Sequence, residues 1–218
     1  MTIESTPTLI FDFDGTICNS LDAAILSLNQ FSEKYGYKKI TPDMVPQLRL
    51  KSSHDVLKEL GVSLIQLPFL APAVKKAFFQ LVPQLKPFDG ILETFEFLKQ
   101  RKIRCGILTS NSKETVTHFN EMNHLSYFDF IYSGVSFFGK DKTLNRAIKN
   151  HQLSKSEVIY VGDETRDIEA ARQVGIKMIS VSWGFHSSEL LKQYSPDYLI
   201  HHPHELREIV GEIRGSSF

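Results

Sequence analysis

The sequence has few cysteines, no long apolar run and no signal-peptide pattern, the features typical of disulfide-rich or zinc-binding, membrane and secreted proteins. Its 218 residues include only two cysteines, Cys18 and Cys105, too few and too far apart for a disulfide framework or a zinc site. No run reaches the roughly 18 apolar residues of a membrane span, since the most apolar stretch, residues 64–74, contains two prolines. The N-terminal residues lack the basic and apolar regions of a signal peptide. We therefore expect a cytoplasmic protein with reduced thiols and no membrane contact.

An excess of either charge is also lacking. Lys plus Arg number 25 and Asp plus Glu number 25, so no net field attracts the whole molecule to nucleic acid or to an anionic membrane. We expect no nucleic-acid partner, and any binding of anions must be local. The hydrophobic fraction of 42% and the charged fraction of 23% are those of an ordinary folded protein. Internal repeats and low-complexity tracts are absent as well.

Short apolar runs alternate with segments of helical spacing along most of the chain. A typical helical segment has Ile168, Ala171 and Val174 one turn apart and ends at Gly175. This alternation predicts an α/β fold with a doubly wound, mainly parallel, Rossmann-like sheet, whose ligand site lies beyond the carboxyl ends of the strands. The expected strands are residues 9–13, 104–109, 130–133, 158–161 and 177–181, with a weaker one at 198–200.

One stretch, residues 20–86, has helical patterns and no convincing strand. Val56, Leu57 and Leu60 form an apolar stripe that ends at Gly61, and the pair Thr41-Pro42 is typical of a helix start. We interpret this stretch as an inserted small α-helical cap subdomain. The α/β core is then expected to consist of residues 1–19 and 87–218.

Two carboxylates mark the end of the first expected strand. Asp12 and Asp14 flank Phe13, so in extended geometry both side chains lean toward the predicted ligand site. Their mutual repulsion would be relieved by a divalent cation, and hard oxygen ligands favour Mg²⁺. The alternative is an acidic turn, but Gly15-Thr16 and the two segments described next favour a site.

Polar groups follow two further strands. Ser110 and Asn111 come directly after residues 104–109, where hydroxyl, amide and backbone N–H groups can hold a phosphate oxygen; Ser112 is suited to cap the next helix. After residues 158–161, Asp163 and Asp167 are four residues apart, which places both on one side of a helical turn. They are candidate metal ligands, and Asp167 is equally suited to complement a helix dipole.

These segments resemble the motifs of the haloacid dehalogenase-like hydrolase superfamily, in its phosphoglycolate phosphatase-like branch with a helical cap. The signature DxDGT reads DFDGT at residues 12–16, the second motif maps to LTSN at 108–111, and the GDxxxD motif reads GDETRD at 162–167. A lysine is expected before the fourth strand. Lys140 in the context FGK is the better match, and Lys142 is the alternative.

The resemblance implies a role for each motif residue. Asp12 would attack phosphorus and form an aspartyl phosphate, while Asp14 would act as general acid and then as general base. Mg²⁺ would be held by Asp12, the main-chain carbonyl of Asp14, Asp163 and also Asp167. Ser110 and Lys140 would hold the equatorial phosphoryl oxygens. The remaining expected substrate-binding residues are Thr16, Asn111, Arg49 and Lys51.

The expected activity is Mg²⁺-dependent hydrolysis of a small phosphorylated metabolite, with 2-phosphoglycolate as a candidate. Asp14 favours a phosphatase over a dehalogenase, because a halide leaving group needs no proton. A phosphomutase or a pyrophosphatase on the same scaffold is an alternative. A phosphoaspartate signalling receiver is an alternative of another class, against which the cap and Asp14 both argue. A non-catalytic binding protein is a further alternative, against which the complete set of motif residues argues.

Substrate choice is expected to depend on the cap. Arg49 and Lys51 in LRLKSS are suited to meet a carboxylate or a second anion, or else form a solvated helix end. Glycines expected here in phosphoglycolate phosphatases are absent, which leaves the substrate open. The histidines of residues 201–204 suggest a metal site, but a solvated loop is the favoured interpretation. The oligomeric state is also left open.

Overall fold

The computed structural model describes residues 7–135 and 139–215, and side chains as far as residue 212. Its centre is a six-stranded sheet in the order β3-β2-β1-β4-β5-β6, and every pairing is parallel. The strands are β1 (Thr8–Phe11), β2 (Arg104–Leu108), β3 (Phe130–Tyr132), β4 (Val158–Gly162), β5 (Lys177–Val181) and β6 (Tyr198–Ile200). The predicted doubly wound α/β fold is confirmed, because the chain runs outward from β1 in both directions.

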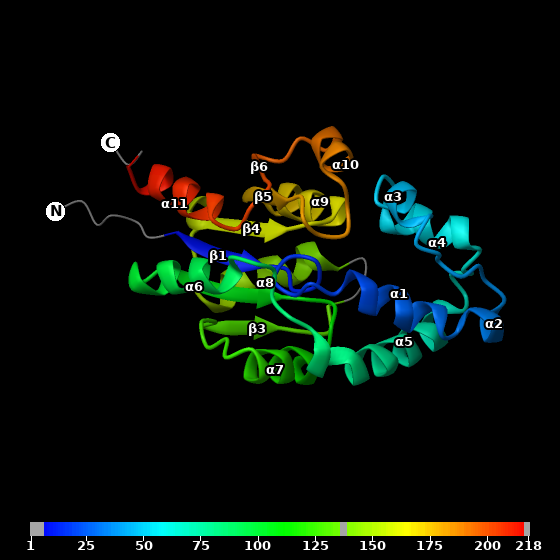
Figure 1. Cartoon of the computed structure of the whole chain (residues 1–218). Helices are drawn as coiled ribbons and strands as arrows, with labels where there is room; N and C mark the ends of the chain where they lie inside the picture. The colour runs from blue at the N-terminus through cyan, green and yellow to red at the C-terminus, as the bar shows by residue number, and fades with distance from the viewer. Residues whose placement is uncertain (1–6, 136–138, 216–218) are drawn as a thin grey trace.

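Helices cover both faces of the sheet (Figure 1). One face packs on α6 (Ile91–Gln100), α7 (Lys113–Met122) and α11 (Glu205–Gly215), and the other on α8 (Lys140–Asn150), α9 (Thr165–Val174) and α10 (Ser188–Gln193). The 3₁₀ turn η2 (Lys155–Glu157) precedes β4. All of β1 is buried, and its side chains alternate between the two faces: Leu9 and Phe11 belong to one apolar cluster and Ile10 to the other.

The strand ends differ slightly from those predicted. β1 ends at Phe11 rather than Phe13, because the chain turns there: the N–H groups of Ile17 and Cys18 both donate to the carbonyl of Phe13 at 2.9 Å. Asp12 still donates its N–H to the carbonyl of Val161 at 2.8 Å. The turn therefore starts at the acidic residues themselves. Cys18 and Cys105 are free and buried, as expected of core residues.

Helices occupy the stretch between β1 and α6. They are α1 (Leu21–Asn29), α2 (Ser32–Tyr35), α3 (Val45–Leu48), α4 (Ser53–Leu60), α5 (Leu67–Leu81) and the 3₁₀ turn η1 (Val82–Gln84). We call residues 21–84 the helical segment. Its members share an apolar cluster of their own that includes Leu48, Leu60 and Leu70. The arrows of β1 and β4 point toward this segment, which lies beyond the carboxyl ends of the strands (Figure 1).

One detail of the helical segment was predicted wrongly. No helix begins at Thr41-Pro42: Met44 donates its N–H to the carbonyl of Thr41 at 3.0 Å in a turn, and α3 begins at Val45 with a proline in its first turn. The predicted end of α4 is confirmed, since Gly61 adopts a left-handed conformation at φ 80°.

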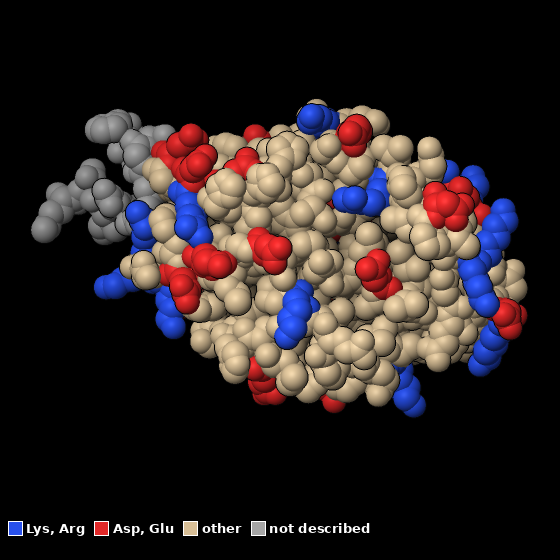
Figure 2. Space-filling model, viewed as in Figure 1, with Lys and Arg blue, Asp and Glu red and all other residues tan. Residues whose placement is uncertain are grey.

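None of the helices in residues 7–135 and 139–215 combines the length and apolarity that crossing a membrane requires. On the face drawn in Figure 2, acidic and basic side chains lie interspersed rather than in separate patches. This mixture agrees with the balanced composition.

Candidate functional site

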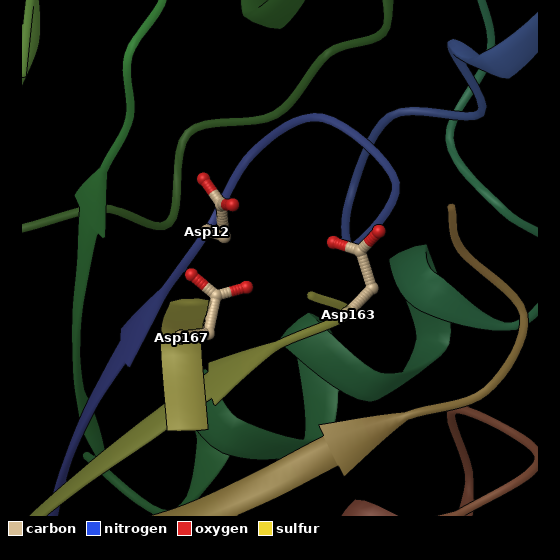
Figure 3. A group of neighbouring side chains, drawn as sticks. All are labelled: Asp12, Asp163 and Asp167. Carbon is tan, nitrogen blue, oxygen red and sulfur yellow. The ribbon is translucent and has the colours of Figure 1, made fainter. Parts of the chain in front are cut away.

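Three aspartates meet at the carboxyl end of the sheet. Asp12 follows β1, Asp163 follows β4, and Asp167 lies in the first turn of α9, with its carboxylate close to that of Asp12 (Figure 3). Each offers an oxygen within 4.8 Å of the others, and all three side chains are buried. Across residues 7–135 and 139–215, this is the one group found with the composition and spacing of a metal site; the histidines at 201, 202 and 204 form no second one.

Lys140 is the cation at this cluster. It is the first residue of α8, its side chain is 3% exposed, and its Nζ lies 2.5 Å from Asp12 Oδ2 and also donates to Asp167 Oδ1. Lys142 is exposed on the same helix. The structure thus brings Lys140 to the aspartates and leaves Lys142 at the surface. The FGK context that favoured Lys140 begins at Phe138, which lies outside the described residues.

Buried negative charge exceeds positive charge in the cluster. Burial raises the pKa of Asp12 to about 7, although Lys140 opposes the rise. Burial, together with Glu164, Asp12 and Asp167, raises the pKa of Asp163 well above its ordinary value. Burial by itself would lower the pKa of Lys140, but Asp12 and Asp167 raise it. Oxygen donors so close together and short of positive charge fit a hard divalent cation such as Mg²⁺.

Asp14 stands apart from the three. Its carboxyl is half-buried and accepts hydrogen bonds from Asn111 Nδ2 at 3.1 Å and from Ser20 Oγ at 3.0 Å. Burial raises the pKa of Asp14, while Asn111 and Ser20 oppose the rise. Asn111, expected to bind substrate, therefore also fixes the orientation of Asp14. The carboxyl group of Asp14 does not belong to the candidate metal group. The expected role of its main-chain carbonyl as a ligand stays a prediction.

The loop after β1 is packed tightly on Asp163. Thr16 Oγ1 donates to Asp163 Oδ1 at 2.8 Å, and the N–H of Phe185 donates to Oδ2 at 2.7 Å. Gly15 has a φ of 74°, and a Cβ there would lie 2.1 Å from Asp163 Oδ2. Thr16 is 1% exposed, so this geometry favours a role in orienting Asp163 over the expected contact with substrate.

Ser110 lies half-buried at the end of β2, and its carbonyl accepts a hydrogen bond from Lys75 Nζ of α5 at 2.6 Å. This contact joins the helical segment to the predicted phosphate-binding loop. Ser112 caps α7 as expected, since its Oγ accepts from the N–H of Thr115 at 3.0 Å. At the start of α9, Asp167 Oδ2 accepts from the N–H of Glu164 at 2.9 Å, while Oδ1 accepts from Lys140. The expected role of Asp167 as a metal ligand stays a prediction.

A second polar cluster adjoins the first. The side chain of Glu164 is buried, and its Oε1 accepts hydrogen bonds from two nitrogens of Arg166, Nε at 2.9 Å and Nη2. Its Oε2 accepts a hydrogen bond from Ser53 of α4. The His186 ring accepts from the N–H of Thr165 at Nδ1 and lies 4.0 Å from Glu164 Oε2. Burial alone would raise the pKa of Glu164, but Arg166 and His186 hold it at about 2. Glu164 is thus a buried carboxylate whose two oxygens are both held by hydrogen bonds, one from Arg166 and the other from Ser53.

Sequence reasoning missed this cluster. Glu164 and Arg166 lie inside the GDETRD motif, between its two aspartates. This position is the sequence feature that could have indicated that both lie near the site. Their partners could not be inferred, because Ser53 is 111 residues from Glu164 in the chain.

Arg49 and Lys51, the expected substrate contacts of the helical segment, lie outside the aspartate cluster. The Arg49 guanidinium donates to the backbone carbonyls of Ser182, Gly184 and Phe185 at 3.3, 2.8 and 3.3 Å. Arg49 thereby joins the end of α3 to the loop after β5. Lys51 forms a partly exposed ion pair with Glu59. Their proposed contact with substrate stays a prediction.

Two cavities lie between the helical segment and the sheet domain. One, of about 300 Å³, is lined by residues that include Lys140, Ser53 and Arg166. The other, of about 360 Å³, has mainly apolar walls from α1, α3, α4 and α5, with Glu164 and Arg166 on the other side. Arg166 and Ser53 line both cavities. The aspartates themselves line neither cavity, but the smaller one contains Lys140, which contacts Asp12 and Asp167, and it is large enough for a small molecule.

Comparison with known proteins agrees with this geometry. A family model described as haloacid dehalogenase-like hydrolase matches residues 9–181. The chain is 34% identical over 206 residues to a phosphoglycolate phosphatase of Synechococcus elongatus, covering 94% of this chain and 97% of the relative. It is 24% identical to the pyrophosphatase PpaX of Bacillus mycoides, covering 95% and 98%.

A solved structure has the same fold. The haloacid dehalogenase-like family protein of Streptococcus pneumoniae superposes with a TM-score of 0.79 at 22% identity, covering 95% of this chain and 99% of that one. The family model spans the three motifs quoted above, from DFDGT to GDETRD. The chain belongs to the haloacid dehalogenase-like hydrolase family.

Proposed function

We propose that this hydrolase is a Mg²⁺-dependent phosphatase that cleaves a small phosphomonoester through an aspartyl-phosphate intermediate. The observation that carries the proposal is the arrangement of Asp12, which lies between Lys140 and two further buried aspartates, with Asp14 two residues along the chain. The relative at 34% identity is named a phosphoglycolate phosphatase. 2-Phosphoglycolate is accordingly the first substrate to test.

The residues would divide the reaction into two displacements. In the first, a carboxylate oxygen of Asp12 forms a bond to phosphorus as the bond to the leaving oxygen breaks, and Asp14 gives that oxygen a proton. In the second, Asp14 takes a proton from the attacking water, whose oxygen bonds to phosphorus and releases Asp12. Asn111 and Ser20 hold the Asp14 carboxyl where both transfers require it.

The charges around phosphorus would be balanced by the chain and by the cation. Lys140 and Ser110 are proposed to hold the equatorial oxygens of the phosphoryl group. Asp12, the carbonyl of Asp14, Asp163 and Asp167 are proposed to hold Mg²⁺. When bound, the ion would supply positive charge that offsets repulsion between the carboxylates and the phosphate. Thr16 would keep Asp163 in the orientation that this requires.

We further propose that residues 20–86 act as a cap on a core of residues 1–19 and 87–218. Support comes from the cavities between the two parts and from the contacts of Arg49, Ser53 and Lys75 across them. The partner expected is a small phosphorylated metabolite. The cytoplasmic location stays a prediction.

The proposal is tested by phosphate release with Mg²⁺ from 2-phosphoglycolate, pyrophosphate, a hexose phosphate and phenyl phosphate. We expect saturable release from at least one monoester, because the proposed nucleophile and acid are both present. Release from pyrophosphate alone would favour the alternative suggested by the 24% identical pyrophosphatase. Transfer to a sugar hydroxyl would indicate a mutase. A phosphoaspartate that persists for minutes without turnover would indicate a signalling receiver.

Lys140 is expected to act on every substrate, since it contacts the proposed nucleophile rather than the leaving group. Lys140→Ala should lower kcat/KM for all phosphomonoesters by about 30- to 1,000-fold, comparable to the loss of one oxyanion donor. Lys142→Ala is the matched control, and we expect it to change kcat/KM less than about threefold. Thermal melting of both variants separates a catalytic loss from unfolding. A larger loss of kcat/KM for Lys142→Ala than for Lys140→Ala would show that Lys142, not Lys140, is the motif lysine.

A further inference from the structure

Arg166 is placed where the two cavities meet. It is the second residue of α9, between the Glu164 cap position and Asp167, and 21% of its side chain is exposed. The residue lines the cavity that contains Lys140 and also the larger cavity under the helical segment. The Arg166 guanidinium, together with Lys140, opposes the burial-driven rise in the pKa of Asp12, so it lies near the proposed nucleophile as well as on both cavities open to a leaving group.

The orientation of Arg166 is fixed by Glu164. Two nitrogens of the guanidinium, Nε and Nη2, donate to Glu164 Oε1, while the opposite oxygen of that carboxylate accepts from Ser53. A carboxylate held on both sides and 5% exposed leaves the arginine little rotational freedom. Side chains fixed in this way are suited to recognise a ligand with little loss of entropy on binding.

The larger cavity has an excess of positive charge in apolar walls. Its charged lining consists of Arg49, Glu164 and Arg166. Burial lowers the pKa of His186, the remaining titratable group there, and Glu164 opposes this fall. An anion entering this space is attracted, because apolar walls weaken the screening of its interaction with a guanidinium.

The two arginines differ in what they already bind. Arg49 donates to three backbone carbonyls and receives a hydrogen bond from the N–H of Ser187 at its own carbonyl, 2.8 Å away. Its position thus depends on the contact between α3 and the loop after β5. Arg166 instead belongs to the same short segment as Asp163 and Asp167, so its distance from the phosphoryl site is set by the motif itself.

We infer that Arg166, positioned by Glu164, is a specificity-determining residue that binds an anionic group on the leaving group of the substrate. The substrate class is phosphate esters or anhydrides whose leaving group carries a carboxylate or a further phosphate. This inference rests on the proposed phosphatase function. It also assigns to the core a selectivity that the sequence alone placed in the helical segment, at Arg49 and Lys51.

The test compares one carboxylated, one phosphorylated and one neutral leaving group, namely 2-phosphoglycolate, pyrophosphate and phenyl phosphate. Arg166→Met should lower kcat/KM for 2-phosphoglycolate or pyrophosphate by about 10- to 100-fold, the range expected for one charged hydrogen-bond partner. The value for phenyl phosphate should change less than about threefold. Which anionic substrate responds identifies the anion. Arg172→Met is the matched control, since Arg172 is exposed on the same helix.

Glu164→Gln tests the positioning role. If Glu164 acts through Arg166, this variant should lose the same selectivity, and the double variant should lose no more than Arg166→Met alone. Equal losses on charged and neutral substrates for Arg166→Met would overturn the inference, and so would an unchanged preference. The inference would also be overturned if Arg49→Ala lowered kcat/KM for the anionic substrates alone while Arg166→Met did not.

A binding measurement keeps this inference separate from the proposed function. Calorimetry with 2-phosphoglycolate and with pyrophosphate is carried out on Asp12→Asn in Mg²⁺, with and without Arg166→Met. Weaker binding of an anionic compound only when Arg166 is replaced supports the inference even if the wild-type chain releases no phosphate. Equal binding by the two proteins contradicts it even if the phosphatase reaction is found.

Discussion

Replacing Asp12 by asparagine is expected to abolish phosphate release while leaving the fold intact. The amide has nearly the same shape, and its oxygen can still accept the hydrogen bond that Asp12 Oδ1 receives from the N–H of Phe13 at 2.8 Å. The amide is not expected to form the proposed bond to phosphorus, because its oxygen is neutral and a far weaker nucleophile than a carboxylate oxygen. We expect kcat to fall by about 10⁴-fold or more, as for the loss of other covalent nucleophiles.

The measurement is phosphate release in Mg²⁺ from the best substrate of the panel, together with thermal melting. Asp43→Asn is the matched control, because Asp43 is exposed in the turn before α3 and should tolerate the change. Mass spectrometry of Asp12→Asn excludes deamidation back to aspartate. Turnover close to that of the wild type, with no deamidated protein detected, would exclude a covalent role for Asp12.

The sheet and the aspartate cluster could be predicted because their causes are local in the sequence. The central strands β1 and β4 are short apolar runs buried on both faces, which is the pattern that a parallel sheet imposes. In parallel strands the carboxyl ends share one edge, so residues directly after Phe11 and Gly162 must lie near one another. The closeness of Asp12 and Asp163 follows from that rule.

The remaining features depend on contacts between distant parts of the chain. The hydrogen bond from Ser53 to Glu164 and the attachment of Arg49 to the loop after β5 join residues more than a hundred positions apart. Neither contact has a periodicity or spacing that would reveal it. The error at Thr41-Pro42 has a similar origin, because a proline is equally suited to a turn and to a helix start. The packing of the helical segment selects the turn.

Removing divalent metal is the second change expected to abolish phosphate release. With Mg²⁺ absent, Lys140 forms ion pairs with Asp12 and Asp167, but the three buried carboxylates lack the two positive charges of the ion, so phosphate would meet a more anionic surface. After exhaustive chelation we expect activity below about 1% of the original, restored by Mg²⁺ and poorly restored by Ca²⁺, whose coordination is larger and less regular. Full activity in the chelated protein would count against a metal-dependent mechanism.

The melting temperature gives a readout of the metal site that does not depend on turnover. An ion that binds only the folded chain stabilises it in proportion to the logarithm of its concentration, so Mg²⁺ should raise the melting temperature of the wild-type protein. Asp163→Asn should reduce this rise, because the amide supplies a weaker ligand and one negative charge fewer. Asp167→Asn should reduce it less, since Oδ1 of Asp167 already accepts from Lys140 and Oδ2 from the N–H of Glu164. Asp43→Asn again serves as the control. If Mg²⁺ raised the melting temperature of both site variants as much as that of the wild type, the segment from Asp163 to Asp167 would not hold the ion.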